Sequence, residues 1–156
     1  IGLGTPASTT VMIEDDDELF PLDGAFPAGW TMPGGADGSW HVSNDPGPFE
    51  GALALRTDTI FDNEMAQVEV GGAWLAGMVS FRVKISSEPT FDVLRFLIDG
   101  VEAARWSGTA NTTWQLFSVA VPAGAHTFRW SYEKDGSGSF GQDAAWLDSV
   151  TLPATP

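Results

Sequence analysis

The chain of 156 residues contains no cysteine. A disulfide framework and thiolate chemistry are therefore excluded, and with only two separated histidines a zinc site is not expected either. Long apolar runs are also missing. No apolar run is as long as a membrane-spanning helix, which needs about 18 residues, so no membrane insertion is expected.

Positive charge is scarce, with 7 bases against 21 acids and a net charge of −14. A field of that sign repels nucleic acid and anionic membranes, and neither is an expected partner. No base occurs before Arg56, and the remaining ones lie in the middle of the chain. A local basic patch is therefore compatible with the acidic whole.

Helical periodicity is nearly absent, and 18 glycines and 10 prolines divide the chain into short segments. Residues 78–85 alternate in the manner of a strand, with Val79 and Phe81 on one side and Arg82 and Lys84 on the other. Further segments of strand composition are 39–43, 52–56, 66–70, 93–98, 101–106, 114–121, 126–133 and 144–152.

Two connections read as turns. Asp99-Gly100 predicts a tight hairpin turn, and residues 122–125 predict the next turn. Many short strands separated by turns predict an all-β fold, a jelly-roll β-sandwich of two antiparallel sheets.

We expect one β-sandwich domain over residues 13–152. Residues 1–12 and 153–156 have the Pro, Ala and Thr composition of linkers. The start at Ile1 indicates a processed chain or a domain excised from a longer protein.

Several short motifs follow one another in a set order. They are Pro27-Ala28-Gly29-Trp30, Gly38-Ser39-Trp40, Gly51-Ala52, Gly77-Met78-Val79-Ser80-Phe81, Phe96-Leu97-Ile98-Asp99-Gly100, Trp106-Ser107-Gly108, residues 123–130, Tyr132-Glu133-Lys134-Asp135 and Asp143-Ala144-Ala145-Trp146-Leu147-Asp148. Together, over residues 20–152, they resemble the jelly-roll domains of secreted bacterial proteins related to the cleaved-adhesin and MAM-like group.

The resemblance implies a concanavalin-like or galactose-binding-like sandwich. Such domains are attached to secreted proteases, glycoside-active enzymes and adhesins, and often carry a structural calcium. The chain departs from the pattern in its first strand. Pro21-Leu22 stand where these domains commonly have Phe-Glu, so Asp23 or the acidic run 14–18 would have to replace that glutamate as a calcium ligand.

Four carboxylates are candidate calcium ligands: Asp143 and Asp148 near the closing strand, Glu50, and Asp23. Calcium takes 6–8 oxygen ligands, usually from several loops, and the first and last strands of a jelly roll can be neighbours. The alternative is structural: Asp143 caps a turn and Asp148 bonds the backbone.

Two tryptophans are candidate ligand contacts. Trp40 and Trp74 follow glycine-rich stretches and are expected to be exposed, so that their rings can stack on sugars. Trp130 and Trp146 share faces with apolar neighbours and are expected to be buried.

Arg82, Lys84, Arg95 and Arg129 lie at outward positions of their strands. If those strands are neighbours, the four side chains converge on one sheet face. Arg82 and Arg95 would then contact an anionic glycan or a partner's carboxylates. The alternative is cross-strand pairing with Asp92, Glu102 and Glu133.

Catalytic signatures are missing. No Gly-x-Ser-x-Gly elbow occurs, and His126 alternates with Phe128 and Trp130, which is typical of a satisfied, partly buried histidine. We therefore expect no enzyme but a secreted or surface-attached bacterial module. Its expected role is to bind polysaccharide or a cell-surface ligand for a larger enzyme or adhesin, with calcium as a stabiliser. The alternative is an interaction domain that packs against neighbouring domains of the same chain.

Overall fold

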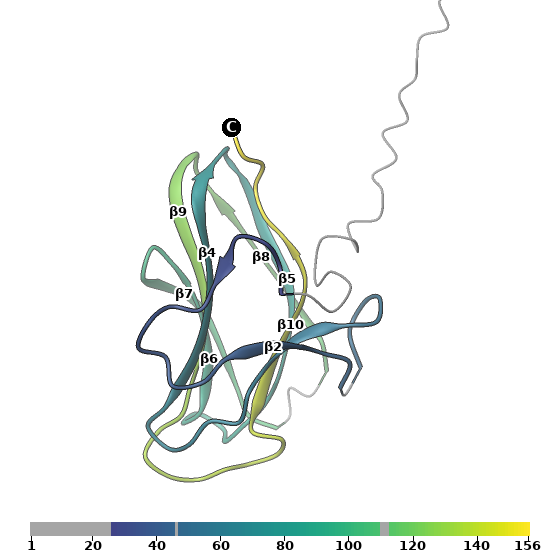
Figure 1. Cartoon of the computed structure of the whole chain (residues 1–156), viewed down its shortest axis with the longest axis vertical. Helices are drawn as coiled ribbons and strands as arrows, with labels where there is room; N and C mark the ends of the chain where they lie inside the picture. The colour runs from purple at the N-terminus through teal and green to yellow at the C-terminus, as the bar shows by residue number, and fades with distance from the viewer. Residues whose placement is uncertain (1–25, 46, 110–112) are drawn as a thin grey trace, which may run out of the picture.

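A computed structural model describes residues 26–45, 47–109 and 113–156, which form a sandwich of ten strands (Figure 1). The strands are β1 (Trp30–Thr31), β2 (Trp40–Ser43), β3 (Ala54–Thr57), β4 (Met65–Trp74), β5 (Gly77–Ser86), β6 (Val93–Ile98), β7 (Val101–Ser107), β8 (Gln115–Val121), β9 (Gly124–Glu133) and β10 (Ala144–Thr151). Within these residues there is no helix, and so none that could cross a membrane. Asp23 and the acidic run 14–18 lie outside the described residues.

The strands form two antiparallel sheets of five. Sheet A has the order β1-β4-β9-β6-β7 and sheet B the order β2-β3-β10-β5-β8. Counted from β3 as the first strand to β10 as the eighth, sheet B runs 1-8-3-6 and sheet A runs 2-7-4-5. This is the order of a jelly roll, in which successive strands mostly alternate between sheets, and the predicted fold class is confirmed.

The predicted and observed boundaries agree closely for several strands. The prediction for 93–98 matches β6, and Asp99 and Gly100 both have positive φ, as the predicted hairpin turn requires. The prediction was wrong at residues 71–74, which belong to β4 because they pair with residues 124–127 of β9. Glycine suits this pairing, since a Cβ on Gly71 would lie 3.2 Å from the Thr127 Oγ1. The two-residue strand β1 was not predicted.

The core lies between the sheets and is rich in aromatic rings. Phe81 of sheet B contacts Phe96 and Trp130 of sheet A at ring-centroid distances of 4.9 and 5.3 Å. Trp30 of β1 stacks on Trp130 at 5.1 Å. Edge-on and offset ring pairs of this kind add stability beyond the area they bury. The faces predicted for residues 78–85 and 126–133 supply seven of the 19 buried residues of this core.

Candidate functional site

The two tryptophans expected at the surface are buried. Trp40 is 1% exposed and donates its indole N–H to Ala66 O, and Trp74 is 8% exposed and donates to His126 O. The expectation of exposure was wrong because both side chains belong to the core cluster, and glycines nearby in the sequence do not decide which way a side chain points. Neither indole offers a face to a sugar.

The predicted basic strip is divided between the two sheets. Arg82 and Lys84 lie on β5 of sheet B, whereas Arg95 and Arg129 lie on β6 and β9 of sheet A. The outer faces of the two sheets point in opposite directions, so the condition under which the four bases would converge is not met.

On the outer face of sheet A the charges neutralise one another. Arg129 pairs with Glu69 at 2.6 Å, and Arg95 pairs with Glu102 at 2.8 Å and with Glu133 at 2.9 Å. Arg105 stands opposite Arg95 in the ladder, and Glu102 bonds both guanidinium groups. The cross-strand pairing proposed as the alternative for Arg95 is thus the observed one.

The outer face of sheet B carries aromatic rings among bases. Trp146 of β10 stands between Arg56 of β3 and Lys84 of β5 in the strand register, and both cations lie over its ring, at 5.3 and 5.0 Å from the centroid. The Lys84 ammonium also lies 5.4 Å from the ring of Trp114. Such cation–π contacts gain strength where water is excluded.

The β2–β3 connection covers part of this face. Asp45 O accepts the indole N–H of Trp146 at 2.8 Å, and Gly47 O accepts that of Trp114 at 3.2 Å. Trp146 is consequently 1% exposed, although it lies outside the core between the sheets. Its predicted burial is confirmed, with this connection rather than the opposite sheet as part of the cover.

Phe49, from the same connection, brings a further ring to this face. Its amide donates to Asp148 Oδ2, its ring meets Trp114 edge-on at 6.4 Å, and the Arg82 guanidinium lies 4.1 Å above its centroid. Phe49 is 38% exposed, and Leu116, opposite Arg82 in the ladder, is 58% exposed. We name Phe49, Arg82, Lys84, Trp114, Leu116 and Trp146 the aromatic–cation face.

Among the predicted calcium ligands, the structure brings Glu50 and Asp148 together. Asp148 is 1% exposed and accepts the amide N–H groups of Phe49, Glu50 and Ser149. Burial raises the pKa of Asp148, the backbone bonds oppose that shift, and the nearby Glu50 carboxylate adds to it. The Ser149 hydroxyl donates to Glu50. The predicted backbone-bonding role of Asp148 is thus also present.

Asp143 lies elsewhere, at the loop end before β10. Five steps of about 3.3 Å each separate Asp143 from Asp148 along the strand. The two carboxylates are therefore too far apart to share one ion. Asp143 accepts from the Tyr132 hydroxyl and from the Lys134 ammonium, both at 2.6 Å. Burial lowers the pKa of Lys134, but its bonds to Asp143 and Asp92 outweigh this and leave the pKa raised.

A second acidic cluster, not predicted from the sequence, surrounds the same lysine. Carboxylate oxygens of Glu88, Asp92 and Asp135 lie within 4.8 Å of one another. Asp92 is fully buried and bonds Lys134, while one oxygen of Glu88 is buried without a hydrogen-bond partner. Burial, and then Asp135 and Asp92, raise the pKa of Glu88. The sequence signal that could have indicated this cluster is the position of the acids, since all three lie within two residues of an end of β5, β6 or β9.

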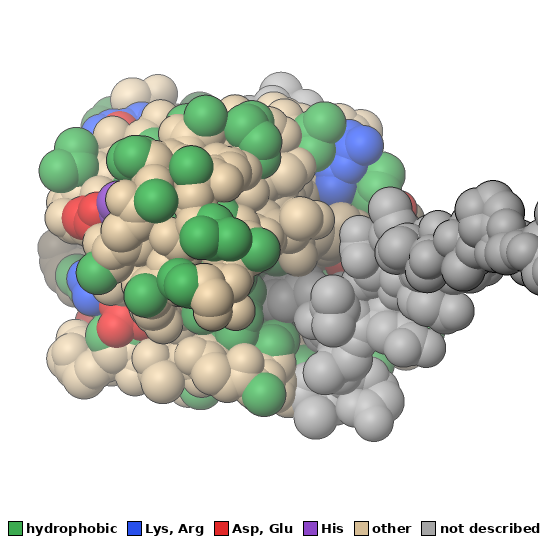
Figure 2. Space-filling model, turned by 90° about the horizontal axis from the view of Figure 1, so that it is seen from above, with side chains coloured by type: hydrophobic (Ala, Val, Ile, Leu, Met, Phe, Trp, Pro, Cys, Tyr) green, Lys and Arg blue, Asp and Glu red, His purple; other side chains and the backbone are tan. Residues whose placement is uncertain are grey.

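The opposite end of the sandwich is where the chain terminates, and Figure 2 looks down onto it. Tan and green atoms make up most of the described surface there, and the charged side chains stand in small separate groups. The described residues at this end therefore form no large patch of one charge.

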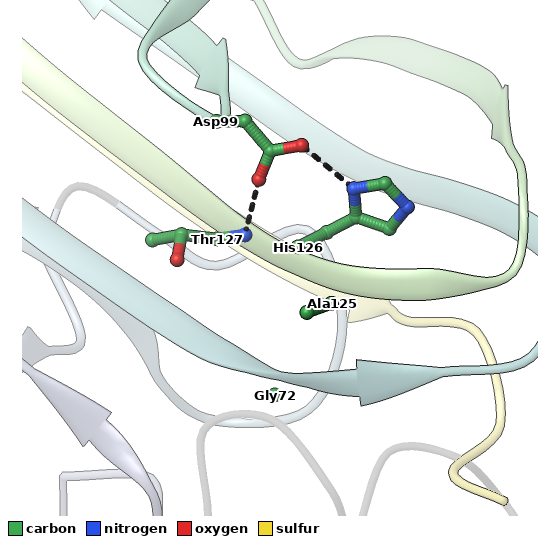
Figure 3. Close-up of a pocket in the computed structure, with 5 residues that line it drawn as sticks. All are labelled: Gly72, Asp99, Ala125, His126 and Thr127. Carbon is green, nitrogen blue, oxygen red and sulfur yellow. Dashed lines mark hydrogen bonds and ion pairs between the residues drawn. The ribbon is translucent and has the colours of Figure 1, made fainter.

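A shallow, open pocket of about 270 Å³ occurs on sheet A, lined by Gly72, Asp99, Ala125, His126 and Thr127 (Figure 3). His126 bonds Asp99 through Nδ1 at 2.7 Å and the Pro122 carbonyl through Nε2 at 2.9 Å. A carboxylate and a carbonyl can only accept, so the doubly protonated ring satisfies both bonds. The bond to Asp99 raises the pKa of His126 accordingly. With both nitrogens engaged, the predicted satisfied histidine is confirmed and no free general base remains there.

We found no protein-family model and no curated protein that matches this chain. Solved structures do match. The K3 cleaved adhesin domain of Lys-gingipain from Porphyromonas gingivalis W83 aligns with a TM-score of 0.55 and 15% identity, over 82% of this chain and 93% of that one. The CBM22-1 xylan-binding domain of Paenibacillus barcinonensis Xyn10C aligns with a TM-score of 0.50 and 16% identity, over 78% and 83%.

The secreted serine protease VesC of Vibrio cholerae aligns with a TM-score of 0.56 and 18% identity, over 72% of this chain. The match spans only 23% of VesC, so this chain is similar to one part of a longer protein. At such identities the comparisons establish the fold. The predicted resemblance to cleaved-adhesin and carbohydrate-binding-module-like jelly rolls is confirmed at that level.

Proposed function

We propose that this domain is a non-catalytic binding module for carbohydrate and that its ligand lies on the outer face of sheet B. The observation that carries the proposal is the aromatic–cation face, where Phe49 and Leu116 are exposed beside the partly exposed Trp114. A sugar ring packs its C–H face against aromatic and apolar groups and takes hydrogen bonds at its rim. Leu116 stands on β8, Trp114 directly precedes that strand, and the Phe49 amide is held on the β2–β3 connection by its hydrogen bond to Asp148.

The fold supports the same proposal. A jelly roll does not fix a function, but structurally similar domains include one described as xylan-binding and others described as adhesin domains. The match to part of a secreted protease supports a module carried by a larger extracellular bacterial protein.

The test is a polysaccharide panel that includes xylan, read by affinity electrophoresis and by tryptophan fluorescence. We expect retardation by at least one polysaccharide, together with a change in indole emission that Trp114→Phe reduces. Trp74→Phe, a change at a buried indole on sheet A, is the matched control. Absence of binding to every polysaccharide would contradict the proposal.

We also propose that the domain binds a structural calcium ion at Glu88, Asp92 and Asp135. Lys134 supplies one positive charge to a site that contains these three acids and Asp143. The unbonded Glu88 oxygen supports a further cation, because a buried carboxylate oxygen without a partner is costly. Glu50 and Asp148, two of the four calcium ligands expected from the sequence, are the second candidate site.

Calcium should raise the melting temperature when it replaces a chelator, since it binds only the folded state. Glu88→Gln should remove that increase, whereas Glu50→Gln should leave it. The reverse result would move the ion to Glu50 and Asp148, and an unchanged melting temperature in the wild type would refute calcium binding.

One observation favours the alternative, a domain that docks on a neighbouring domain. Phe61, Phe91 and Phe140 are 74, 58 and 50% exposed and lie on three connections at one end of the sandwich. If glycans fail to bind, serine at these three positions should weaken association with the adjoining domain of the parent protein.

A further inference from the structure

Two bases, Arg82 and Lys84, differ from the other five in this protein of net charge −14. In the described part of the chain neither forms an ion pair or donates a hydrogen bond to an acceptor. The other five bases all pair with carboxylates: Arg56 with Asp45, Arg95 with Glu102 and Glu133, Arg105 with Glu102, Arg129 with Glu69, and Lys134 with Asp92 and Asp143. Acids are three times as numerous as bases, so two adjacent unpaired bases on one face need an explanation.

Arg82 is positioned to bind an anion. Its guanidinium stacks on the Phe49 ring at 4.1 Å from the centroid. Phe49 is in turn held by the hydrogen bond from its backbone amide to Asp148. Stacking occupies the face of the planar group and leaves the N–H donors of its edge, which match a carboxylate in a two-pronged contact. The donor fork is therefore preorganised, which lowers the cost of binding.

Lys84 adds positive charge to the same face, two positions along β5. It is only 8% exposed, and its ammonium lies between the rings of Trp146 and Trp114. Burial lowers its pKa, with Asp45 opposing the shift, so the fold keeps this charge in an unfavourable setting. A negative charge bound at Arg82 would offset that cost.

We infer that the aromatic–cation face binds an acidic polysaccharide: a uronate carboxylate pairs with Arg82, and the C–H face of a sugar ring packs on Phe49 and Leu116. This inference rests on the proposed function and names its ligand class. A saccharide is favoured over an acidic peptide because exposed ring and aliphatic surface adjoin the guanidinium, 38% of Phe49 and 58% of Leu116 being accessible. The net negative charge repels polyanions at long range, but at about 0.15 M salt this repulsion is screened beyond about 8 Å.

The experiment compares polygalacturonate with its methyl ester, which keeps the backbone and removes the charge. Titration calorimetry at about 0.15 M salt would be run with the wild type, Arg82→Ala and Arg105→Ala. The last is the matched control, because it removes one arginine from the other sheet. Each variant's melting curve checks that it is folded, and Arg82→Lys tests whether the fork, rather than the charge alone, is needed.

We expect the wild type to prefer the acid over the ester, and Arg82→Ala to weaken binding of the acid about tenfold or more, as loss of a charged hydrogen-bonded pair does. Arg105→Ala should have no effect. Equal binding of acid and ester, unchanged by Arg82→Ala, would overturn the acidic-ligand inference and leave glycan binding intact. Failure to bind any polysaccharide would overturn both. Binding of polyglutamate, but of no polysaccharide, would replace the glycan with an acidic peptide partner.

Discussion

Among the described residues, every arginine on the outer face of sheet A forms an ion pair with a carboxylate, whereas Arg82 and Lys84 on sheet B form none. Both faces use the same backbone alternation and stand on the same core. The sheet A pattern neutralises an exposed surface. On sheet B, positive charge lies against aromatic rings, and Lys84 and Trp146 of this face are buried. Because the two faces share the same alternation and the same core, the difference in charge pairing favours sheet B as the face that binds a ligand.

The comparison can be tested first at Trp146, the buried ring of the sheet B face. Trp146→Ala should destabilise the fold by about 3 kcal/mol or more, as removal of a core ring does, because the β2–β3 connection closes over it. Arg129→Ala, on the central strand of sheet A, should cost less than about 1 kcal/mol. Urea unfolding measures both. Similar losses for the two variants would remove the distinction between the faces.

The ion pairs of sheet A should contribute modestly. Arg95→Ala leaves Glu133 without its partner, and we expect a loss of about 0.5–1 kcal/mol, since Arg95 is one third exposed and water screens its pairs. About 0.5 M salt should shrink that loss further. A loss above about 2 kcal/mol, insensitive to salt, would show that this ladder supports the fold after all.

Acid–base titration separates the sheets further. The bond to Asp99 raises the pKa of His126 above its ordinary 6.5, so its contribution to stability is complete below about pH 6.5 and is lost as pH rises through the raised pKa. The melting temperature should fall over that interval, and His126→Gln should abolish the step. A wild-type curve that is flat from pH 6 to alkaline pH would contradict the bonding at both ring nitrogens.

The smallest effect is expected at Lys84. Because burial lowers its pKa, Lys84→Met should leave the free energy of unfolding unchanged or raise it by up to about 1 kcal/mol. In the wild type, stability should rise as pH increases from the lowered pKa of Lys84 toward 10.5, and this rise should vanish in the variant. A loss above about 1.5 kcal/mol would mean that the indole contacts make this cation structural.

The sequence alone was sufficient for the fold class and most strands. Val79, Phe81, Val83 and Ile85 alternate with polar residues, and all four are at most 1% exposed. A period of two reports which side chains share a face, and the core follows from that. The same signal explains why the partly buried, doubly bonded His126 could be predicted.

The local sequence pattern could not predict which sheet each strand would join, or which loops would cover the outer face of that sheet. Arg82 and Arg95 look alike in sequence, but the jelly-roll crossover sends β5 to one sheet and β6 to the other. Burial of Trp74 beside glycines, separation of Asp143 from Asp148, and assembly of the Glu88 cluster likewise depend on contacts between distant segments. The sequence thus determined which residues of the cleanly alternating strands face inward, because that is a property of neighbouring positions. Tertiary structure decided which outward residues meet, because that depends on strand order and on the loops that close over each sheet.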